Sequence, residues 1–132
     1  MSRSEYSDDI DQWELIKWRG QVASAIRGQW GQAFLQELLE ALDQMPEKRL
    51  IRNNMRDQSG CVCTLGAIGA KRGLDLDSID PHDYEQLSRT FGIAHQLAQE
   101  IMFLNDDVND TPEHRWQRMR NWVVANLVTP KP

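Results

Sequence analysis

Residues 29–46 of the chain read QWGQAFLQELLEALDQMP, and they carry its clearest pattern. Apolar side chains recur three or four positions apart with polar ones between them, as on an amphipathic helix. Pro46 follows at the point where such a helix ends. The pattern predicts a helix over residues 30–45 at the centre of the core, with Leu38 or Leu39 almost fully buried. Its apolar positions are Trp30, Phe34, Leu35, Leu38, Leu39, Leu42 and Met45.

On the N-terminal side, apolar residues at helical spacing predict a helical segment over residues 9–27. Gly20 interrupts this spacing and Gly28 is a typical helix stop, so the segment is either one bent helix or two short ones. Residues 1–8 are polar and show no periodicity, which predicts a flexible N-terminal arm.

On the C-terminal side, the helical period is lost over residues 47–63. A turn cluster at residues 57–60, DQSG, lies between two apolar stretches and predicts a small irregular β-hairpin. Capping residues, apolar spacing and glycine stops then predict four further helices. They span residues 63–72, 80–91, 93–104 and 111–127, and residues 129–132 are predicted to form a C-terminal tail.

The composition is that of an ordinary globular domain. The chain has 132 residues, 40% of them hydrophobic, and its 15 Lys and Arg against 20 Asp and Glu give a net charge of −5. We therefore expect a mainly α, single compact domain of five or six helices with a small irregular β-hairpin over residues 9–128. No stretch reaches the ~18 uncharged apolar residues of a membrane span, and the N-terminus has no apolar signal core. A cytoplasmic protein without a membrane partner is the expectation.

Five tryptophans lie near the two ends of the sequence, which is many for this length. Because each tryptophan buries a large apolar area, they predict a core that joins the two ends. Any tryptophan left exposed would be a natural anchor for a partner, since aromatic residues dominate the energetics of interfaces. The five are Trp13, Trp18, Trp30, Trp116 and Trp122.

Positive charge is concentrated in one basic stretch, which consists of Lys48, Arg49, Arg52 and Arg56. The stretch follows a predicted helix end and precedes a glycine turn, so we expect an exposed loop or hairpin, where binding residues are often placed. We predict that it contacts a macromolecular partner, either a host protein with an acidic surface or, as an alternative, a nucleic acid. If the basic stretch has no binding role, it is a solvated charged face that keeps the protein soluble.

Cys61 and Cys63 are separated by one residue, which is too close for an ordinary disulfide. A lone C-x-C is also a poor zinc motif, so we predict reduced, metal-free thiols and no cofactor. The alternative is a Cys63-dependent enzyme, because Cys63 lies at a predicted helix N-terminus, where the helix dipole lowers the pKa of a thiol. Such an enzyme, or a zinc site, would need His82, His95 or His114, and the spacing brings none of them to the thiols.

Several short motifs stand out along the chain: MPEKRLI at residues 45–51, CTLGA at 63–67, FGIA at 91–94, ND at 105–106, TPE at 111–113, RW at 115–116 and WV at 122–123. In these motifs the chain resembles a group of small uncharacterised proteins encoded by bacterial viruses, prophages and proteobacterial chromosomes. The likeness covers most of residues 19–127. It brings no assigned activity and implies a mobile-element origin. Many small viral proteins bind a host protein, and some inhibit bacterial defence systems, so we expect a non-enzymatic accessory protein of this kind.

Overall fold

The fold is that of a computed structural model, which describes residues 12–128. Within this range the chain forms six α-helices and one short 3₁₀ helix. They are α1 (Gln12–Arg27), α2 (Gln29–Gln44), α3 (Thr64–Lys71), η2 (Leu76–Ser78), α4 (Tyr84–Phe91), α5 (His95–Asp106) and α6 (Pro112–Asn126). The expected mainly helical fold is confirmed, and residues 12–27 form one helix that runs through Gly20. The predicted arm at 1–8 and tail at 129–132 lie outside the described residues.

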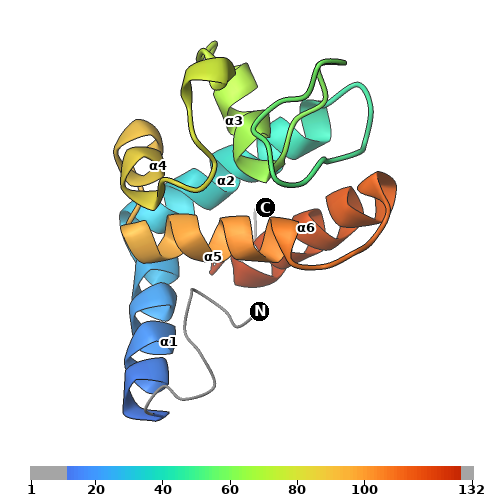
Figure 1. Cartoon of the computed structure of the whole chain (residues 1–132). Coiled ribbons are helices and arrows are strands. Elements are labelled where there is room, and N and C mark those ends of the chain that lie inside the picture. Colours follow the sequence, from blue (N-terminus) through green and yellow to red (C-terminus); the bar gives the residue numbers. More distant parts are fainter. Residues whose placement is uncertain (1–11, 129–132) are drawn as a thin grey trace.

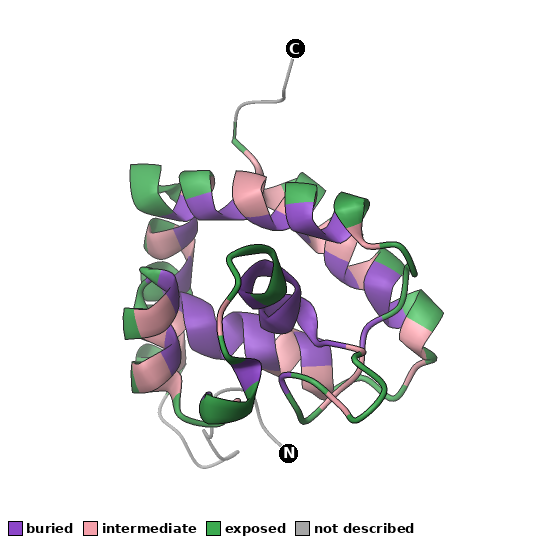
Figure 2. Cartoon of the chain, turned by 90° about the horizontal axis from the view of Figure 1, so that it is seen from above, coloured by how far each residue is buried: buried purple, intermediate pink, exposed green. Residues whose placement is uncertain are grey.

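Helix α2 lies at the centre of the fold, in contact with α1, α3 and α6 (Figure 1). Its apolar side faces these neighbours, and Figure 2 shows the buried residues gathered on the inward sides of the helices. Leu38 is fully buried and Leu39 is half-buried, so the prediction for this helix is confirmed at Leu38. Trp30 departs from the predicted apolar face, with 74% of its surface exposed, because the first turn of α2 lies at the corner with α1.

The predicted core between the two ends of the sequence forms, but it takes in only some of the tryptophans. Trp18 of α1 and Trp116 of α6 are buried. The indole N–H of Trp116 donates a hydrogen bond to the carbonyl of Leu42 at 3.1 Å, which satisfies its polar atom inside the core. Trp122 is half-buried and Trp13 is exposed. The tryptophans are therefore divided between the core and the surface.

The corner between α1 and α2 depends on a close approach of the two backbones. A Cβ atom on Gly31 would lie 1.9 Å from the carbonyl oxygen of Ala25, a separation that no side chain can adopt. The side-chain amide of Gln32 ties the same corner to the end of α6, because it donates to the carbonyls of Ile26 at 2.7 Å and Asn126 at 3.0 Å. Gly31 and Gln32 together set the direction in which α1 leaves the rest of the fold (Figure 1).

The predicted β-hairpin over residues 47–63 is wrong. The described part of the chain contains no strand, and this segment holds one isolated antiparallel bridge, between Arg56 and Val62. The backbone leaves the extended conformation at Asn53, whose φ of +70° lies in the left-handed region. The N–H of Asn53 also pairs away from the segment, because it donates to a carboxylate oxygen of Asp106 at 3.0 Å. The segment is therefore a loop held by the neighbouring helices.

Asn105, at the end of α5, holds this loop against α3. Its side chain is fully buried, and both of its polar atoms are hydrogen-bonded. The oxygen accepts from the backbone N–H and from the hydroxyl of Thr64, at 3.0 and 2.6 Å. The amide nitrogen donates to the carbonyl of Ile51 at 3.0 Å and to the carboxylate of Asp106 at 2.7 Å. One side chain thus joins α5, the first turn of α3 and the loop.

A buried ion pair fastens the other side of the loop. Arg115 of α6 is 2% exposed, and its guanidinium donates to the carbonyl of Leu50 at 2.9 Å and lies 3.0 Å from the carboxylate of Asp110. The carboxylate of Asp110 also accepts a hydrogen bond from Arg118 at 2.8 Å. Burial raises the pKa of Asp110, but the hydrogen bonds from Arg118 and His114 and the charges of the two arginines outweigh it and hold the pKa below its usual value.

Replacing Leu38 by Ala is expected to lower the free energy of unfolding by roughly 2–5 kcal/mol, because the substitution removes buried apolar surface and leaves a cavity. Chemical denaturation followed by circular dichroism measures this change. Glu40→Ala, at an exposed position of the same helix, is the control and should shift stability by no more than about 0.5 kcal/mol. Equal midpoints for Leu38→Ala and the parent would contradict the central place of α2.

Replacing Asp110 by Asn is expected to cost about 3 kcal/mol at pH 7, because it leaves the buried guanidinium of Arg115 without its counter-charge. The lowered pKa of Asp110 means that its contribution is fully present above the unfolded-chain value of about 4 and is lost as the pH falls through the folded value. The variant should therefore lose less stability than the parent on acidification below about pH 4. The control Asp107→Asn, at an exposed neighbouring position, should show the parent's dependence of stability on pH. If Asp110→Asn loses as much stability as the parent below about pH 4, the ion pair does not contribute as proposed.

Candidate functional site

Lys48, the first residue of the predicted basic stretch, caps the end of α2. Its ammonium group donates hydrogen bonds to the carbonyls of Asp43 and Met45, the latter at 2.6 Å. It also lies 5.6 Å from the centre of the Trp116 ring. Carbonyls in the last turn of a helix lack partners within that helix, and a cation there is stabilised by the helix dipole. These contacts give Lys48 a role in the fold itself.

The other three cations of the basic stretch differ in their surroundings. Arg56 forms an ion pair with Asp77 at 2.7 Å, and the half-buried Arg52 donates to the side chain of Asn109 at 3.2 Å. The side chain of Arg49 is exposed and makes no hydrogen bond or ion pair with another described residue. The four cations are thus divided among separate contacts, and their use by a partner stays a prediction.

Cys63 lies inside the core and not at a reactive surface. Its side chain is fully buried, and its sulfur accepts a hydrogen bond from the N–H of Gly66 at 3.4 Å as the N-cap of α3. Burial raises the pKa of Cys63 to about 12 and outweighs the hydrogen bond from Gly66. The alternative of a thiol activated by the helix N-terminus is therefore contradicted, because desolvation favours the neutral thiol more than the helix dipole favours the thiolate.

The three histidines considered as a base or a ligand lie in different parts of the fold. They are His82 before α4, His95 at the start of α5 and His114 in the first turn of α6. Over residues 12–128, no group of three or more His, Cys, Asp or Glu side chains is arranged to hold a metal ion. Both cysteines are free thiols. Among the described residues, no contact therefore supports the thiol-enzyme or the zinc-site alternative.

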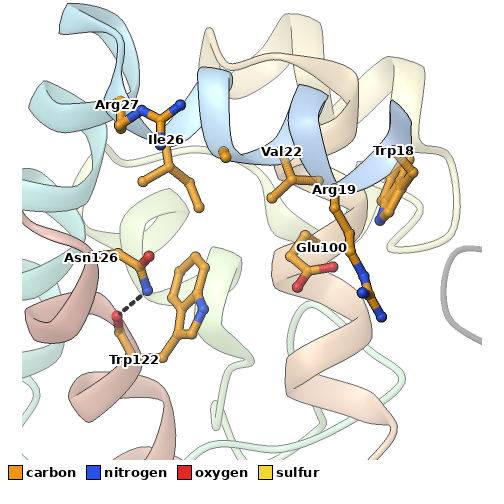
Figure 3. Close-up of a pocket in the computed structure, with 9 residues that line it drawn as sticks. Trp18, Arg19, Val22, Ile26, Arg27, Glu100, Trp122 and Asn126 are labelled. Carbon is orange, nitrogen blue, oxygen red and sulfur yellow. Dashed lines mark hydrogen bonds between the residues drawn. The ribbon is translucent and has the colours of Figure 1, made fainter. Parts of the chain in front are cut away.

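A cavity of about 250 Å³, which we call the tryptophan cavity, lies between α1, α5 and α6 (Figure 3). Trp18 of α1 and Trp122 of α6 line it, and the carboxylate of Glu100 points into it from α5. Glu100 is only 6% exposed, so the wall of this hollow contains a nearly buried charged group. The other residues that line the cavity are Arg19, Val22, Ala23, Ile26, Arg27 and Asn126.

A second hollow of about 470 Å³, the corner groove, lies on the other side of α1, where the α1–α2 corner meets the turn between α4 and α5. The exposed ring of Trp30 forms one of its walls, and the exposed Arg89 lies at another. Most of the remaining lining residues are small, which leaves the groove open. They are Ser24, Ala25, Gly28, Gly31, Ser88, Gly92, Ile93 and Ala94.

The two hollows flank α1, and exposed apolar and cationic residues gather around them. Among residues 12–128, the large apolar residues that are exposed lie on α1, in the first turn of α2 or near the end of α6, with Val108 as the exception. We define the α1 surface as the exposed residues Ile16, Lys17, Arg19, Arg27, Trp30 and Arg89 together with the two hollows. Helix α1 and the first turn of α2 thus carry both exposed apolar residues and exposed cations.

Sequence reasoning missed the tryptophan cavity because its central residue looks exposed in the sequence. Glu100 follows Gln99 between apolar residues of α5, which is the pattern of a solvent-facing position. Both polar residues are buried because α5 contacts α1, α3, α4 and α6 and has little free surface. The signal that could have indicated the cavity was the pair Trp18 and Trp122, since tryptophans at the two ends of the chain were expected to meet.

Comparisons of the chain with protein-family models, with curated proteins and with solved structures give no match. No helix between residues 12 and 128 combines the length and the apolar character that crossing a membrane requires.

Alkylation of the folded protein with iodoacetamide at pH 8 is expected to modify the half-buried Cys61 well before Cys63, because burial and a pKa of about 12 keep Cys63 protonated and inaccessible. Both residues should react at similar rates in guanidinium chloride. Peptide mass spectrometry measures the two rates. Comparable modification of Cys63 and Cys61 in the folded protein would restore the thiol enzyme as an alternative.

Proposed function

We propose that this chain is a small, non-enzymatic accessory protein of the type encoded by bacterial viruses and prophages, and that it binds a host protein through the α1 surface. The observation that most supports this is the gathering of exposed apolar residues and cations around two hollows at one end of the fold. Apolar patches rimmed by polar residues are typical of surfaces that bind other proteins, and tryptophan and arginine are typical anchors there.

The charge of the α1 surface favours a partner with an acidic face. Helix α1 carries Lys17, Arg19 and Arg27 against the single acidic residue Glu14, in a chain whose net charge is −5. Arg89 of α4 adds another cation at the edge of the corner groove. Opposite charges across an interface speed the encounter and exclude partners of the wrong sign.

The overall charge of the chain supports a protein partner over a nucleic acid. A nucleic-acid site combines many cations along one face of a strongly basic domain, and this chain is acidic overall. The corner groove, at about 470 Å³, falls within the ~300–1,000 Å³ of pockets for small molecules, and the tryptophan cavity, at about 250 Å³, is smaller. A space of this size suits a single side chain of a partner protein.

Binding alone is sufficient for the biological role that we propose, which is inhibition of a bacterial defence system. An inhibitor of this kind acts by occupying a surface of its target, and it needs no nucleophile, metal or cofactor. The buried, protonated state of Cys63 is consistent with such a role. The inhibitor proposal itself comes from the resemblance to small viral proteins.

The test is to capture partners from the cells that naturally make the chain, identify them by mass spectrometry, purify the main one and measure its Kd by calorimetry. The double variant Ile16→Ser with Trp30→Ser is expected to weaken binding at least about 30-fold, because exposed aromatic anchors contribute about 2 kcal/mol or more when they are buried at an interface. Both positions are exposed, so the fold should be retained.

Two single variants at the opposite end serve as controls. Val108→Ser removes an exposed apolar residue away from α1, and Arg49→Glu reverses the exposed cation of the basic stretch. Both should bind with the parent's Kd, because the proposal places the partner on the α1 surface and not on the basic stretch. A loss of affinity confined to Arg49→Glu would place the binding site on the basic stretch. Capture of a nucleic acid whose affinity falls steeply with salt would show that the partner is a nucleic acid and not a protein.

A further inference from the structure

We infer that the corner groove binds the C-terminal residue of the partner protein, a large apolar residue whose side chain lies against Trp30 and whose free carboxylate lies beside Arg89. The inference rests on the proposed function, and it names the part of the partner that the α1 surface recognises. It is carried by a hollow of about 470 Å³ that an exposed tryptophan and an exposed arginine line, where the ends of α1 and α4 meet the starts of α2 and α5 (Figure 1).

The wall of the groove is mostly apolar. The ring of Trp30 forms one side, and Ile93 with the small residues Ala25 and Ala94 lies along the rest. The other uncharged lining residues are glycines and serines, which leave room for a side chain of the partner. Removing apolar surface from water favours association, so a side chain of the size of leucine gains affinity here. A volume of about 470 Å³ holds such a side chain together with the groups attached to its Cα atom.

The charge of the lining selects an anion. Among the described residues that line the groove, Arg89 is the only charged one. Its ion pair with Glu85 spans 3.8 Å between two exposed side chains, and water screens such a pair, so Arg89 is available to a bound anion at little cost. A carboxylate held against the apolar wall is screened less by water, which strengthens its attraction to Arg89.

Two helix N-termini at the groove favour the same charge. Gly28 precedes α2 and Ala94 precedes α5, and both residues line the groove. Neither of them supplies a side chain that accepts a hydrogen bond from the first turn of its helix. The N–H groups of a first turn have no partner within the helix, and together with the helix dipole they attract anions.

The helix ends of opposite polarity, those of α1 and α4, already have partners for the carbonyls that lie at the groove. The carbonyl of Ser24 in α1 accepts a hydrogen bond from the N–H of Gly28 at 3.1 Å. The carbonyl of Ser88 in α4 accepts from the N–H groups of Gly92 and Ile93 at 2.9 and 3.2 Å. The lining therefore combines bonded carbonyls with N–H groups that no side chain caps, and this balance favours an anion over a cation.

The closeness of the apolar wall and the positive charge favours a chain terminus over an internal acidic residue. In a C-terminal residue the side chain and the carboxylate are attached to the same carbon atom, so one residue reaches both features. An internal aspartate or glutamate would bring backbone groups from both sides against the apolar wall, where polar groups without a hydrogen bond are costly. Capture of a C-terminal carboxylate by backbone N–H groups is an established mode of peptide recognition.

The experiment uses the full chain labelled with ¹⁵N and follows the indole N–H signal of Trp30 and the backbone N–H signals of Gly31 and Gln96 by NMR during titration with acetylated tetrapeptides. The probes are Gly-Ser-Gly-Leu with a free carboxylate, the same peptide amidated, Gly-Ser-Gly-Gly with a free carboxylate, and amidated Gly-Ser-Leu-Asp. We expect the first to move all three signals with a Kd of about 1 mM and the other three to bind at least about tenfold more weakly.

The variant Ala94→Asp tests where the carboxylate lies. A carboxylate at this N-cap accepts from the first turn of α5 itself, so the variant should melt at a higher temperature and bind the free-carboxylate Gly-Ser-Gly-Leu at least about tenfold more weakly. Ala94 is exposed, and its φ of −63° and ψ of 146° suit a capping residue. The control Gln58→Asp, exposed in the loop after α2, makes the same change in net charge and should bind like the parent.

The variant Arg89→Gln tests the cation. It should weaken the binding of the free-carboxylate Gly-Ser-Gly-Leu about threefold or more and leave the affinity for the amidated peptide unchanged, a difference that a mere change of shape would not give. Arg49→Gln, at an exposed position outside the groove, is the matched control and should change neither affinity.

Equal affinity of the parent for the free-carboxylate and the amidated Gly-Ser-Gly-Leu, or an absence of shifts at Trp30, would overturn the inference. So would unchanged binding to Ala94→Asp. Tighter binding of N-acetyl-leucine than of the tetrapeptide would also overturn it, because the groove would then belong to a small carboxylic acid.

These results are distinguishable from failure of the proposed function. A captured partner that depends on Ile16 and Trp30 while the peptides do not bind leaves the proposed function standing and overturns the inference. Binding of the free-carboxylate peptide, when no captured protein depends on Ile16 and Trp30, overturns the proposed function instead and supports the preference of the groove for a chain terminus.

Discussion

The buried side chain of Asn105 is the contact on which the arrangement of α3, α5 and the loop after α2 depends. A primary amide carries an acceptor and a donor group a short distance apart, and this one serves two different segments at once. Its oxygen satisfies Thr64 in the first turn of α3, where N–H groups have no partner within the helix. A buried polar network stabilises a fold only when all its members are bonded, so this position tolerates little change.

Residues of the short motifs that stand out in the sequence have structural tasks. Cys63 and Thr64 begin α3, and Asn105 joins that beginning to the loop. Arg115 and Trp116 of α6 each donate to a backbone carbonyl in the core. These motifs describe how the chain folds, and the α1 surface, which shares few of them, can change without disturbing the fold.

The helices could be predicted from the sequence because each follows from residues close to one another, as the apolar spacing around Leu38 illustrates. The loop at residues 47–63 could not, because the backbone group of Asn53 bonds to a carboxylate 53 positions away. The raised pKa of Cys63 could not be derived from its place at a helix N-terminus, since its burial depends on elements far along the chain. At the candidate site, the tryptophans were visible in the sequence, whereas the burial of Glu100 follows only from the packing around α5.

The close backbone contact at Gly31 separates the residues that set the angle of α1 from the residues that α1 exposes. The close crossing with Ala25 fixes the angle of α1, so the outward residues of that helix have no part in setting its direction. They can therefore be exchanged during evolution while the scaffold beneath them stays the same. Substitutions along this single helix would change the exposed surface without changing the fold, so related chains would diverge there first and at the α1–α2 corner last.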